Sequence, residues 1–431
     1  MHIHPPLPQS LHGWLNYISH QHRAEIVMGL ERVRAVWESM GRPQSPINIM
    51  VGGTNGKGST CAMLESILGI AGYKTGLYTS PHLVYFNERV RLGGKSAGDA
   101  DFITAFATVE AARRSLAEDV PLTYFEYTTL AALSMFARAH LDVAILEVGM
   151  GGRLDAVNIV DADASIVMNV DLDHQSYLGD TIEKIGLEKA HIYRAGFPAI
   201  FADVNPPASL LAYAARVGAD LRSLNRDYRY SVMQGQWQFF GRDAARHSLP
   251  MPALRGSYQL KNASAALAAL EALRNQLPVS QGHIKRGLLE VEWPGRLQVL
   301  PGRPTVVLDV AHNPHAAHAL CDALGTMAYF ENTYAVFGML QDKDIDQVIE
   351  IIKARIDFWC VAGLEKSAGA RGASSEMLAQ KLVAHGVEGR FSRHVDIAGA
   401  FAAARARAGQ NDRILVFGSF YTVAETMNAL K

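Results

Sequence analysis

"INIMVGGTNGKGST", residues 47–60, joins an apolar run to a turn that holds four glycines and one lysine. The apolar run predicts a buried strand, and the residues from Lys57 onward predict a helix. A glycine-rich turn between a strand and a helix N-terminus gathers backbone N–H groups around one point, which suits an anion such as phosphate. Lys57 adds a positive charge there. The strict phosphate-loop pattern places Ser or Thr directly after the lysine, but Gly58 stands before Ser59 here, so an ordinary tight turn remains an alternative.

On both sides of this turn, short β-branched runs alternate with longer Ala- and Leu-rich stretches, as in repeated βα units around a parallel sheet. We expect strands at 47–53, 74–80, 142–149, 165–170 and 198–204. We expect helices at 61–71, 99–116, 126–139 and 180–193, the last with a capping box from Asp180 to Glu183. Residues 228–240 alternate as antiparallel strands do, which predicts a hairpin at the sheet edge.

Two Pro-Gly pairs interrupt the pattern within residues 290–304, and a second βα series begins with TVVLDVAHNP at Thr305. We place a domain boundary there. Residues 1–294 are expected to form a larger α/β domain with a mostly parallel sheet, and residues 295–431 a smaller Rossmann-like domain.

Composition narrows the choice of partner. The 431 residues include 41 Lys and Arg against 42 Asp and Glu, giving a net charge of −1, and no basic run stands out. This balance gives no support for binding to nucleic acid or to an anionic membrane. We therefore expect a small-molecule partner, with no nucleic acid and no membrane.

The cysteines and the N-terminal residues help to predict the cellular compartment of the protein. Cys61, Cys321 and Cys360 lie far apart, which indicates neither a disulfide framework nor a cysteine zinc site. The first ten residues lack a signal-peptide pattern, and no uncharged apolar stretch reaches about 18 residues. We expect a cytoplasmic monomer. His2 and His4 lie beside prolines, where a loose tail is expected rather than a metal site.

Polar side chains follow two more of the expected strands. Glu147 ends the run DVAILE, at the carboxyl end of a parallel strand, where open α/β sheets bind ligands. A carboxylate beside a phosphate loop suits Mg²⁺; the alternative is a solvated loop acid. Asp171, Asp173 and His174 follow the run SIVMNV and reach the same edge, where His174 is either a ligand or a structural residue.

Lys189 interrupts an apolar helical stripe. Ile182, Ile185 and Ile192 recur around it at spacings of three and four. An unpaired ammonium on such a face is costly, so Lys189 must extend to solvent, meet an acid or be chemically converted. From the pattern alone, extension to solvent is favoured.

Several stretches taken together resemble one family: GTNGKGS, SPHL, TYFEYTT, LEVGMGGRLDAVNIV, LDH, EKA and DVAHNPHA. They resemble the bacterial bifunctional dihydrofolate synthases/folylpolyglutamate synthases of the Mur ligase superfamily. The resemblance runs from LHGWLNYI at residues 11–18 to GSFYTVAE at 418–425. It implies a Mur-ligase-like P-loop ATPase domain followed by the smaller domain, and it explains Gly58 as a habit of the family.

The resemblance also implies roles for single residues. The positions implied to contact ATP are Thr54, Asn55, Gly56, Lys57, Gly58, Ser59, Asn262, Arg296 and Asp309. Ser80 and Glu147 would hold one Mg²⁺ and His174 a second. Lys189 resembles a lysine that the superfamily carbamylates to N6-carboxylysine, which reverses the preference for solvent. Lys57, Glu147, His174 and Lys189 are the implied catalytic residues.

For the pterin or folate, the resemblance points to three segments and two further residues. They are Val27, Met28, Gly29 and Leu30; Thr123, Tyr124, Phe125 and Glu126; Leu154, Asp155 and Ala156; and His312 and Ser419. Tyr124 and Phe125 offer flat apolar faces to a planar ring, or else they are core residues at a helix start. Val157 departs from the family's usual threonine.

The implied reaction is ATP-driven amide formation between L-glutamate and dihydropteroate or a reduced folate, through an acyl phosphate that closure of the smaller domain protects from water. A folate-only polyglutamate synthase is the alternative within the family. A cell-wall ligase would need a UDP-binding domain, for which the N-terminal stretch leaves no room. A nucleotide-dependent binding protein would not need Glu147, His174 and Lys189 together.

Overall fold

The computed structural model describes residues 6–22, 26–45 and 47–431, so His2 and His4 lie outside the described residues. The chain forms two compact units. The first extends to His82 and includes residues 87–252 and 260–291; the second comprises residues 83–86, 253–259 and 292–431. The division therefore differs from a single cut before Gly295, because two short segments of the N-terminal part pack with the second unit.

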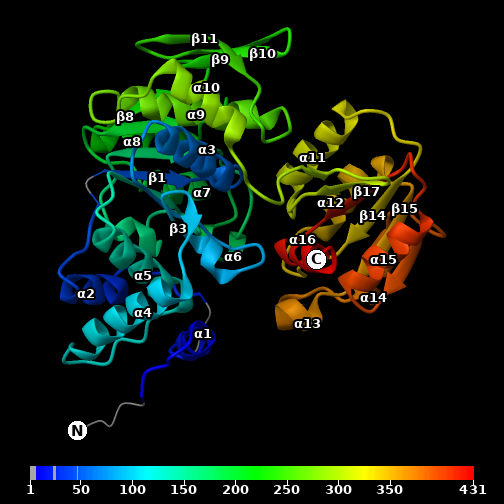
Figure 1. The fold of residues 1–431 in the computed structure, drawn as a ribbon, viewed down its shortest axis with the longest axis horizontal. Helices are drawn as coiled ribbons and strands as arrows, with labels where there is room; N and C mark the ends of the chain where they lie inside the picture. Colours follow the sequence, from blue (N-terminus) through cyan, green and yellow to red (C-terminus); the bar gives the residue numbers. More distant parts are fainter. Residues whose placement is uncertain (1–5, 23–25, 46) are drawn as a thin grey trace. The chain divides into compact units, whose positions relative to one another are not determined.

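The first unit is built on an eight-stranded sheet in the order β4-β3-β2-β5-β1-β6-β7-β8 (Figure 1). Strands β2 to β8 in this order pair in parallel, while β3 and β4 add an antiparallel edge. All residues of β1, β5 and β6 are buried, as expected of parallel strands covered on both faces. The strand bounds are β1 Asn48–Gly52, β2 Thr75–Tyr78, β3 Val90–Leu92, β4 Lys95–Ser96, β5 Val143–Glu147, β6 Ala164–Val167, β7 Pro198–Phe201 and β8 Asp220–Ser223. The predicted parallel α/β architecture is confirmed.

Ten α-helices of the described residues belong to this part of the chain. They are α1 Leu11–Ser19, α2 Glu31–Ser39, α3 Lys57–Ile70, α4 Asp99–Arg114, α5 Tyr124–Arg138, α6 Gln175–Leu178, α7 Ile182–Ala190, α8 Ala208–Val217, α9 Tyr258–Ala272 and α10 Gln281–Glu290. Helix α3 packs against α10, and α1 and α2 pack against α4 and α5. The first two helices thereby form a layer with α4 and α5.

The predicted capping box at α7 is wrong. Thr181 is the N-cap residue, and its side chain accepts a hydrogen bond from the N–H of Lys184. Glu183 instead accepts from the N–H groups of Ala208 and Ser209, at 3.1 and 2.7 Å. The glutamate is drawn to the N-terminus of α8 because unpaired amides there favour a carboxylate.

The predicted antiparallel hairpin forms, but not at the edge of the large sheet. Strands β9 (Arg229–Met233), β10 (Gln236–Phe240) and β11 (Ala245–Pro250) make a separate sheet, which Figure 1 shows beyond α9 and α10. Its largest buried side chains are those of Trp237 and Phe239. Phe239 lines a small cavity together with Leu267 and Leu270 of α9 and Ile284 of α10, so the small sheet packs on these two helices instead of extending the large sheet.

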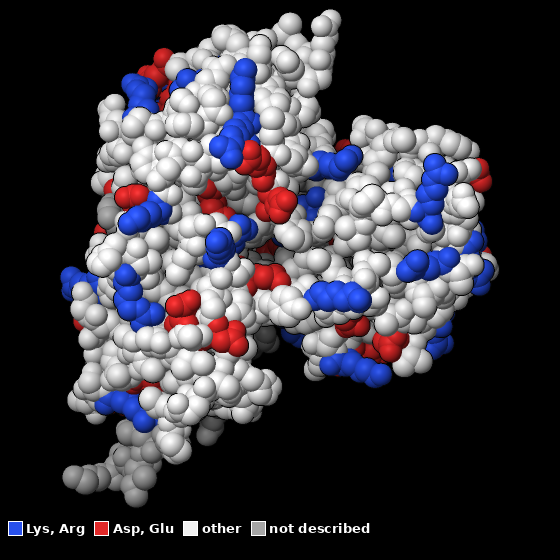
Figure 2. All heavy atoms as spheres, in the orientation of Figure 1, with Lys and Arg blue, Asp and Glu red and all other residues white. Residues whose placement is uncertain are grey.

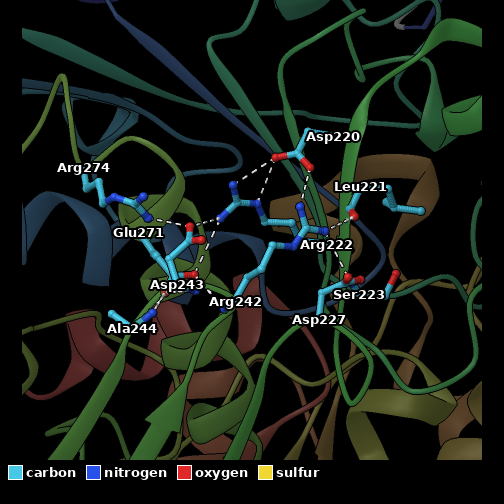
Figure 3. Close-up of polar contacts among 10 residues, drawn as sticks. All are labelled: Asp220, Leu221, Arg222, Ser223, Asp227, Arg242, Asp243, Ala244, Glu271 and Arg274. Carbon is cyan, nitrogen blue, oxygen red and sulfur yellow. Dashed lines mark hydrogen bonds and ion pairs between the residues drawn. The ribbon is translucent and has the colours of Figure 1, made fainter.

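A network of charges fastens this small sheet (Figure 3). We call it the hairpin clamp; it comprises Asp220, Arg222, Asp227, Arg242, Asp243, Glu271 and Arg274. The Glu271 carboxylate accepts hydrogen bonds from the N–H groups of Arg242, Asp243 and Ala244, at 3.1, 3.2 and 2.8 Å. The Arg242 guanidinium reaches Asp220 and Asp227 at 2.6 and 2.9 Å. The turn between β10 and β11 is thus tied to α9 and to the β8 strand region.

The second unit contains a six-stranded sheet in the order β12-β13-β17-β14-β15-β16. Its strands are β12 Gln298–Leu300, β13 Thr305–Leu308, β14 Thr333–Phe337, β15 Phe358–Ala362, β16 Phe391–His394 and β17 Arg413–Phe417; only β12 pairs antiparallel. Its helices are α11 Pro314–Thr326, α12 Ile345–Ile352, α13 Glu365–Ala368, α14 Ser375–Ala384, α15 Ile397–Arg407 and α16 Phe420–Ala429. Successive residues of β14 alternate between two hydrophobic clusters, with Phe337 in one and Val336 in the other. Helices therefore cover both faces, as the Rossmann-like prediction requires.

The surface matches the near-neutral composition. On the face drawn in Figure 2, Lys and Arg side chains lie among Asp and Glu side chains, and much of the area is uncharged. In the described part of the chain, no helix combines the length and the hydropathy needed to cross a membrane.

Candidate active site

The order β2-β5-β1-β6 brings four loops to one edge of the large sheet. Val51 pairs with Glu147, Gly52 with Val167, and Tyr78 with Leu146. Because these strands are parallel, their carboxyl ends lie on the same side. We call this region the phosphate edge; it comprises residues 53–59, Ser80, Glu147 and residues 169–174. The predicted loop ends are thus neighbours.

The glycine-rich loop has a backbone that its glycines make accessible. Gly53 and Gly56 have φ angles of 130° and 91°, and a β-carbon at Gly53 would lie 2.9 Å from the backbone N of Met168. Helix α3 begins at Lys57, so its first N–H groups have no carbonyl partner within the helix. The Lys57 ammonium folds back to donate to the carbonyls of Gly53 and Thr54, at 3.0 and 3.2 Å. The loop therefore presents N–H groups and one ammonium together.

Asn169, which the sequence analysis missed, holds this loop. Its Oδ1 accepts from the N–H groups of Thr54 and Asn55, at 3.1 and 2.9 Å, and its Nδ2 donates to the carbonyl of Asn55 at 3.1 Å. Both amides thus have a protein acceptor, and the contact of Thr54 and Asn55 with ATP stays a prediction. The N–H groups from Gly56 to Ser59 are better placed for an anion. The only sequence signal was a polar residue, Asn169, within the mostly apolar run expected as a strand at 165–170.

Glu147 and Ser80 are brought together as predicted. The Ser80 N–H donates to Glu147 Oε2 at 3.0 Å, and the Glu147 side chain is buried. Burial raises the pKa of the nearby Cys61 thiol; the Glu147 carboxylate raises it further and the Lys57 ammonium lowers it. Glu147 and Lys57 therefore both lie within electrostatic reach of Cys61, near the N-terminus of α3.

His174 precedes the short helix α6 in a left-handed conformation, with φ of 53°. Its N–H donates to Asp173 Oδ1 at 2.9 Å, and its side chain is about one-third exposed. Within residues 6–22, 26–45 and 47–431, no three His, Cys, Asp or Glu side chains converge as a metal cluster. Mg²⁺ bound beside phosphates usually takes one or two protein carboxylates, with waters and phosphate oxygens as its other ligands.

Lys189 does not extend to solvent: only 4% of the residue is exposed. A β-carbon at Gly152 would lie 2.7 Å from the carbonyl O of Glu188 and 3.0 Å from that of Lys189, so the glycine turn closes over this part of α7. Burial lowers the pKa of Lys189 to about 7; Lys57 lowers it further, while Asp173 and Asp155 raise it. The solvent-directed alternative is therefore wrong, and Lys189 lies within electrostatic reach of the phosphate edge.

Asp155 lies in the glycine turn after β5. Burial raises its pKa to about 6, against the lowering effect of N–H groups from Met150 and Val157, which donate to it at 2.8 and 3.0 Å. A β-carbon at Gly149 would lie 2.7 Å from the Phe125 ring and 3.2 Å from Asp155 Oδ2. Phe125 and Asp155, from two of the predicted substrate segments, therefore border the same turn.

Arg32, a second residue that the sequence analysis missed, joins the remaining segment. Its Nη2 donates to the carbonyl of Val27 and to Glu126 Oε1, both at 2.9 Å. Glu126 and Thr123 form the capping box of α5, and both are buried. The two residues fix the start of α5, while Tyr124 and Phe125 between them are partly exposed. Contact of the four residues with substrate stays a prediction.

Asn262 lies beside the phosphate loop in the first unit. The place of a β-carbon on Gly56 is 2.6 Å from Asn262 Oδ1. The side chain is buried, and it arises from α9, far along the chain from the loop. The structure therefore brings this predicted ATP-contacting residue to the loop.

The other predicted residues gather in the second unit. Asp309 is buried and accepts from the N–H groups of Leu297 and Ala311, at 2.7 and 2.8 Å. Burial raises its pKa, and Arg296 lowers it. The Arg296 guanidinium lies 5.0 Å from the centre of the Phe420 ring, and the His312 ring lies 6.0 Å from it. Ser419 caps α16 just before that ring, so the four predicted residues surround one sheet edge.

Comparisons with known proteins extend over the whole chain. The family profile of the Mur ligase middle domain matches residues 51–270, and that of the Mur ligase glutamate ligase domain matches residues 295–420. The sequence is 42% identical to the dihydrofolate synthase/folylpolyglutamate synthase of Escherichia coli K12, over 99% of this chain and 97% of that protein.

Solved structures give the same result. FolC of E. coli in complex with DHPP and ADP superposes with a TM-score of 0.92 at 42% identity, covering 99% of both chains. A bifunctional folylpolyglutamate synthase/dihydrofolate synthase with Mn, AMPPNP and L-glutamate bound superposes with a TM-score of 0.89 at 41% identity, again over 99% of both chains.

Proposed function

Because this chain belongs to the dihydrofolate synthase/folylpolyglutamate synthase family of Mur ligases, we propose that its phosphate edge binds ATP and drives amide-bond formation. As a member of this family the chain is an ATP-dependent ligase that uses a divalent metal and adds L-glutamate to dihydropteroate and to reduced folates. The observation that carries the assignment of the site is the shared strand edge, where Lys57, the Ser80–Glu147 pair and Asn262 border one loop.

The reaction has two steps. A carboxylate oxygen of dihydropteroate, or of the terminal glutamate of a folate, attacks the γ-phosphorus of ATP, and ADP leaves. The nitrogen of L-glutamate, having lost a proton, then attacks the carbonyl carbon of the acyl phosphate, and phosphate leaves as the amide bond forms. Neither step requires a protein nucleophile, so catalysis rests on positioning and on charge.

The residues of the phosphate edge supply that charge. Lys57 and the first N–H groups of α3 would hold the phosphoryl oxygens on which negative charge moves during transfer. We propose two Mg²⁺ sites, one at Ser80 and Glu147 and one at His174. The oxygen and imidazole donors fit such sites, because Mg²⁺ keeps several waters and phosphate oxygens as ligands. When bound, the ions would neutralise charge on the phosphoryl oxygens.

Lys189 fits conversion to N6-carboxylysine, which we propose for it. Only a neutral amine reacts with CO₂, and a pKa of about 7 keeps much of the Lys189 amine neutral near neutral pH. The carbamate would replace a buried positive charge near Lys57 by a negative one. It would therefore remove the repulsion between the two ammonium groups.

For the substrates we propose the turn bordered by Phe125 and Asp155, with Met28 nearby, as the place of the pterin ring. A β-carbon at Gly151 would lie 3.9 Å from Met28 Cε, which supports a site shared by the three segments. We propose that Arg296 and Asp309 contact ATP, and that His312 and Ser419 contact glutamate or folate. A monomeric state remains a prediction, which light scattering tests.

Product analysis tests the proposed function. The purified protein is incubated with ATP, Mg²⁺ and L-glutamate, and with either dihydropteroate or tetrahydrofolate. Mass spectrometry should detect one added glutamyl residue on dihydropteroate, and one or more on tetrahydrofolate. Products from tetrahydrofolate alone would instead establish the folate-only alternative, and no glutamylated product from either would refute the ligase assignment.

A further inference from the structure

The phosphate loop is held from outside by the segment that follows β6. Besides the side-chain bonds of Asn169, the N–H of Thr54 lies 3.1 Å from the carbonyl O of Asn169. Asn169 is only 5% exposed, and its amide both donates to and accepts from the loop backbone. An aspartate of the same shape would lose the donated bond and would add a negative charge where a triphosphate must bind.

Thr54 makes a second connection between the same two segments. Its hydroxyl donates to the carbonyl of Asp171 at 3.3 Å and accepts from the N–H of Asp171 at 3.0 Å. Asp171 is three residues before His174. The hydroxyl therefore fixes the stretch that carries His174 to the loop that carries Lys57.

We propose that Asn169 and Thr54 are positioning residues for ATP-dependent ligation, Asn169 by shaping the phosphate loop and Thr54 by fixing the His174 segment to it. We call the contacts of these two residues the loop clasp. The proposal rests on the proposed function, since it takes the loop as the ATP site. In this proposal Thr54 acts indirectly, by positioning other residues, because its N–H and its hydroxyl both form hydrogen bonds within the protein.

Asn48 provides a matched control for Asn169. It is also 5% exposed, and its Nδ2 donates to a backbone carbonyl, that of Asp161, at 3.2 Å. Asn48 lies at the amino end of β1, whereas the phosphate loop follows the carboxyl end of the same strand. Substitution of either asparagine removes a buried amide, but only Asn169→Ala loosens the clasp.

The experiment measures Mg·ADP affinity by calorimetry, the KM for ATP and the thermal midpoint for Asn169→Ala, Asn169→Asp and Asn48→Ala. The Asn169 variants should raise the Kd for Mg·ADP and the KM for ATP about tenfold, which is the loss of about 1.4 kcal/mol of binding. Asn48→Ala should lower the thermal midpoint and leave both constants near the wild-type values. If the Asn169 variants lower the midpoint but also leave both constants unchanged, the positioning role is refuted.

Thr54 is tested by a conservative pair that keeps the variant foldable. Thr54→Ser retains the hydroxyl, whereas Thr54→Val loses it, so the Mg²⁺ concentration for half-maximal rate should be about tenfold higher in Thr54→Val than in Thr54→Ser. Equal Mg²⁺ requirements in the two variants would overturn the clasp. Failure of the ligase assignment would show separately, as wild-type protein that makes no glutamylated product while Mg·ADP affinity still depends on Asn169.

Discussion

The hairpin clamp and the phosphate edge each hold charged side chains, but they treat those charges differently. In the clamp, charges lie beside opposite charges: Arg222 is 2.9 Å from Asp220, and Arg242 is 2.6 Å from the same carboxylate (Figure 3). Burial raises the pKa of Asp220, but hydrogen bonds from Arg242 and Arg222 outweigh it, so the net shift is downward. The clamp therefore stabilises its charged forms.

Beside the phosphate edge, the pKa shifts of Lys189 and Asp155 favour the neutral forms of these groups. The pKa of Lys189 falls to about 7 and that of Asp155 rises to about 6, burial being the largest cause of each. Such shifts carry a cost in stability that a purely structural region avoids, and they gather at sites that bind ligands. A network of paired ions can therefore be purely structural. Buried titratable groups whose pKa shifts favour the uncharged form instead indicate a ligand-binding site.

Of the changes predicted here, loss of Lys57 should have the largest effect, and it should reduce catalysis at the phosphate edge. Lys57→Ala removes the ammonium that would face the phosphoryl oxygens, and we expect kcat/KM to fall by about 10²–10³-fold. ADP release measures the effect. As a control from the clamp, Arg242→Ala should lower the thermal midpoint while kcat/KM stays near the wild-type value. Near-normal turnover in Lys57→Ala would remove the lysine from the mechanism.

Lys189→Ala should reduce turnover by about 10²-fold, because the buried carbamate proposed there is lost. Short carboxylates such as acetate or propionate, added to this variant, should restore part of the rate by occupying the vacated space. The wild-type protein should also carry an added carboxyl group that is lost in acid. An unmodified Lys189 in fully active enzyme would contradict the carbamate.

In the hairpin clamp, loss of Glu271 should reduce stability and leave catalysis unchanged. Glu271→Ala leaves three backbone N–H groups of the β10–β11 turn without their carboxylate acceptor, and we expect the first unit to lose about 2 kcal/mol of stability. Denaturant unfolding of wild type and variant measures the change. The KM for ATP should not move. A raised KM with unchanged stability would mean that the clamp serves the active site after all.

The smallest of the four expected effects is on the pH dependence of stability. This dependence should have opposite signs for Asp155, beside the phosphate edge, and for Asp220, in the hairpin clamp. Folded Asp155 keeps a proton up to about pH 6 that the unfolded chain releases near 3.8, so its contribution falls as pH rises from about 4 to 6. Asp220 has a lowered pKa, so its contribution is present above 3.8 and is lost as pH falls through the folded pKa. Thermal midpoints of Asp155→Asn and Asp220→Asn, measured from pH 3 to 7, should each flatten one of these slopes. Slopes of the same sign would defeat the contrast.

The phosphate edge could be predicted because the patterns that indicate it lie within short stretches of the sequence. A run such as DVAILE predicts a buried parallel strand, and the carboxyl ends of parallel strands meet at one edge, so the sequence alone placed Glu147 near Lys57. The family resemblance added the residues of the second unit. Both steps needed only short stretches of sequence.

The features that the sequence did not predict depend on partners distant in the chain. Asn169 and Arg32 act through hydrogen bonds to Asn55 and Glu126, more than ninety residues away from each. Glu183 was assigned to the wrong helix end for the same reason. The burial of Lys189 depends on the glycine turn that packs over α7. No periodicity within one helix carries that information.

Omission of single substrates from the ADP-release assay tests the central claim most directly. Wild-type protein is given ATP and Mg²⁺ with dihydropteroate and L-glutamate, then with each of the last two left out. Sustained ADP release that requires both is the predicted result. Release at the same rate with either one missing would show that the phosphate edge hydrolyses nucleotide without ligation, and would contradict the account.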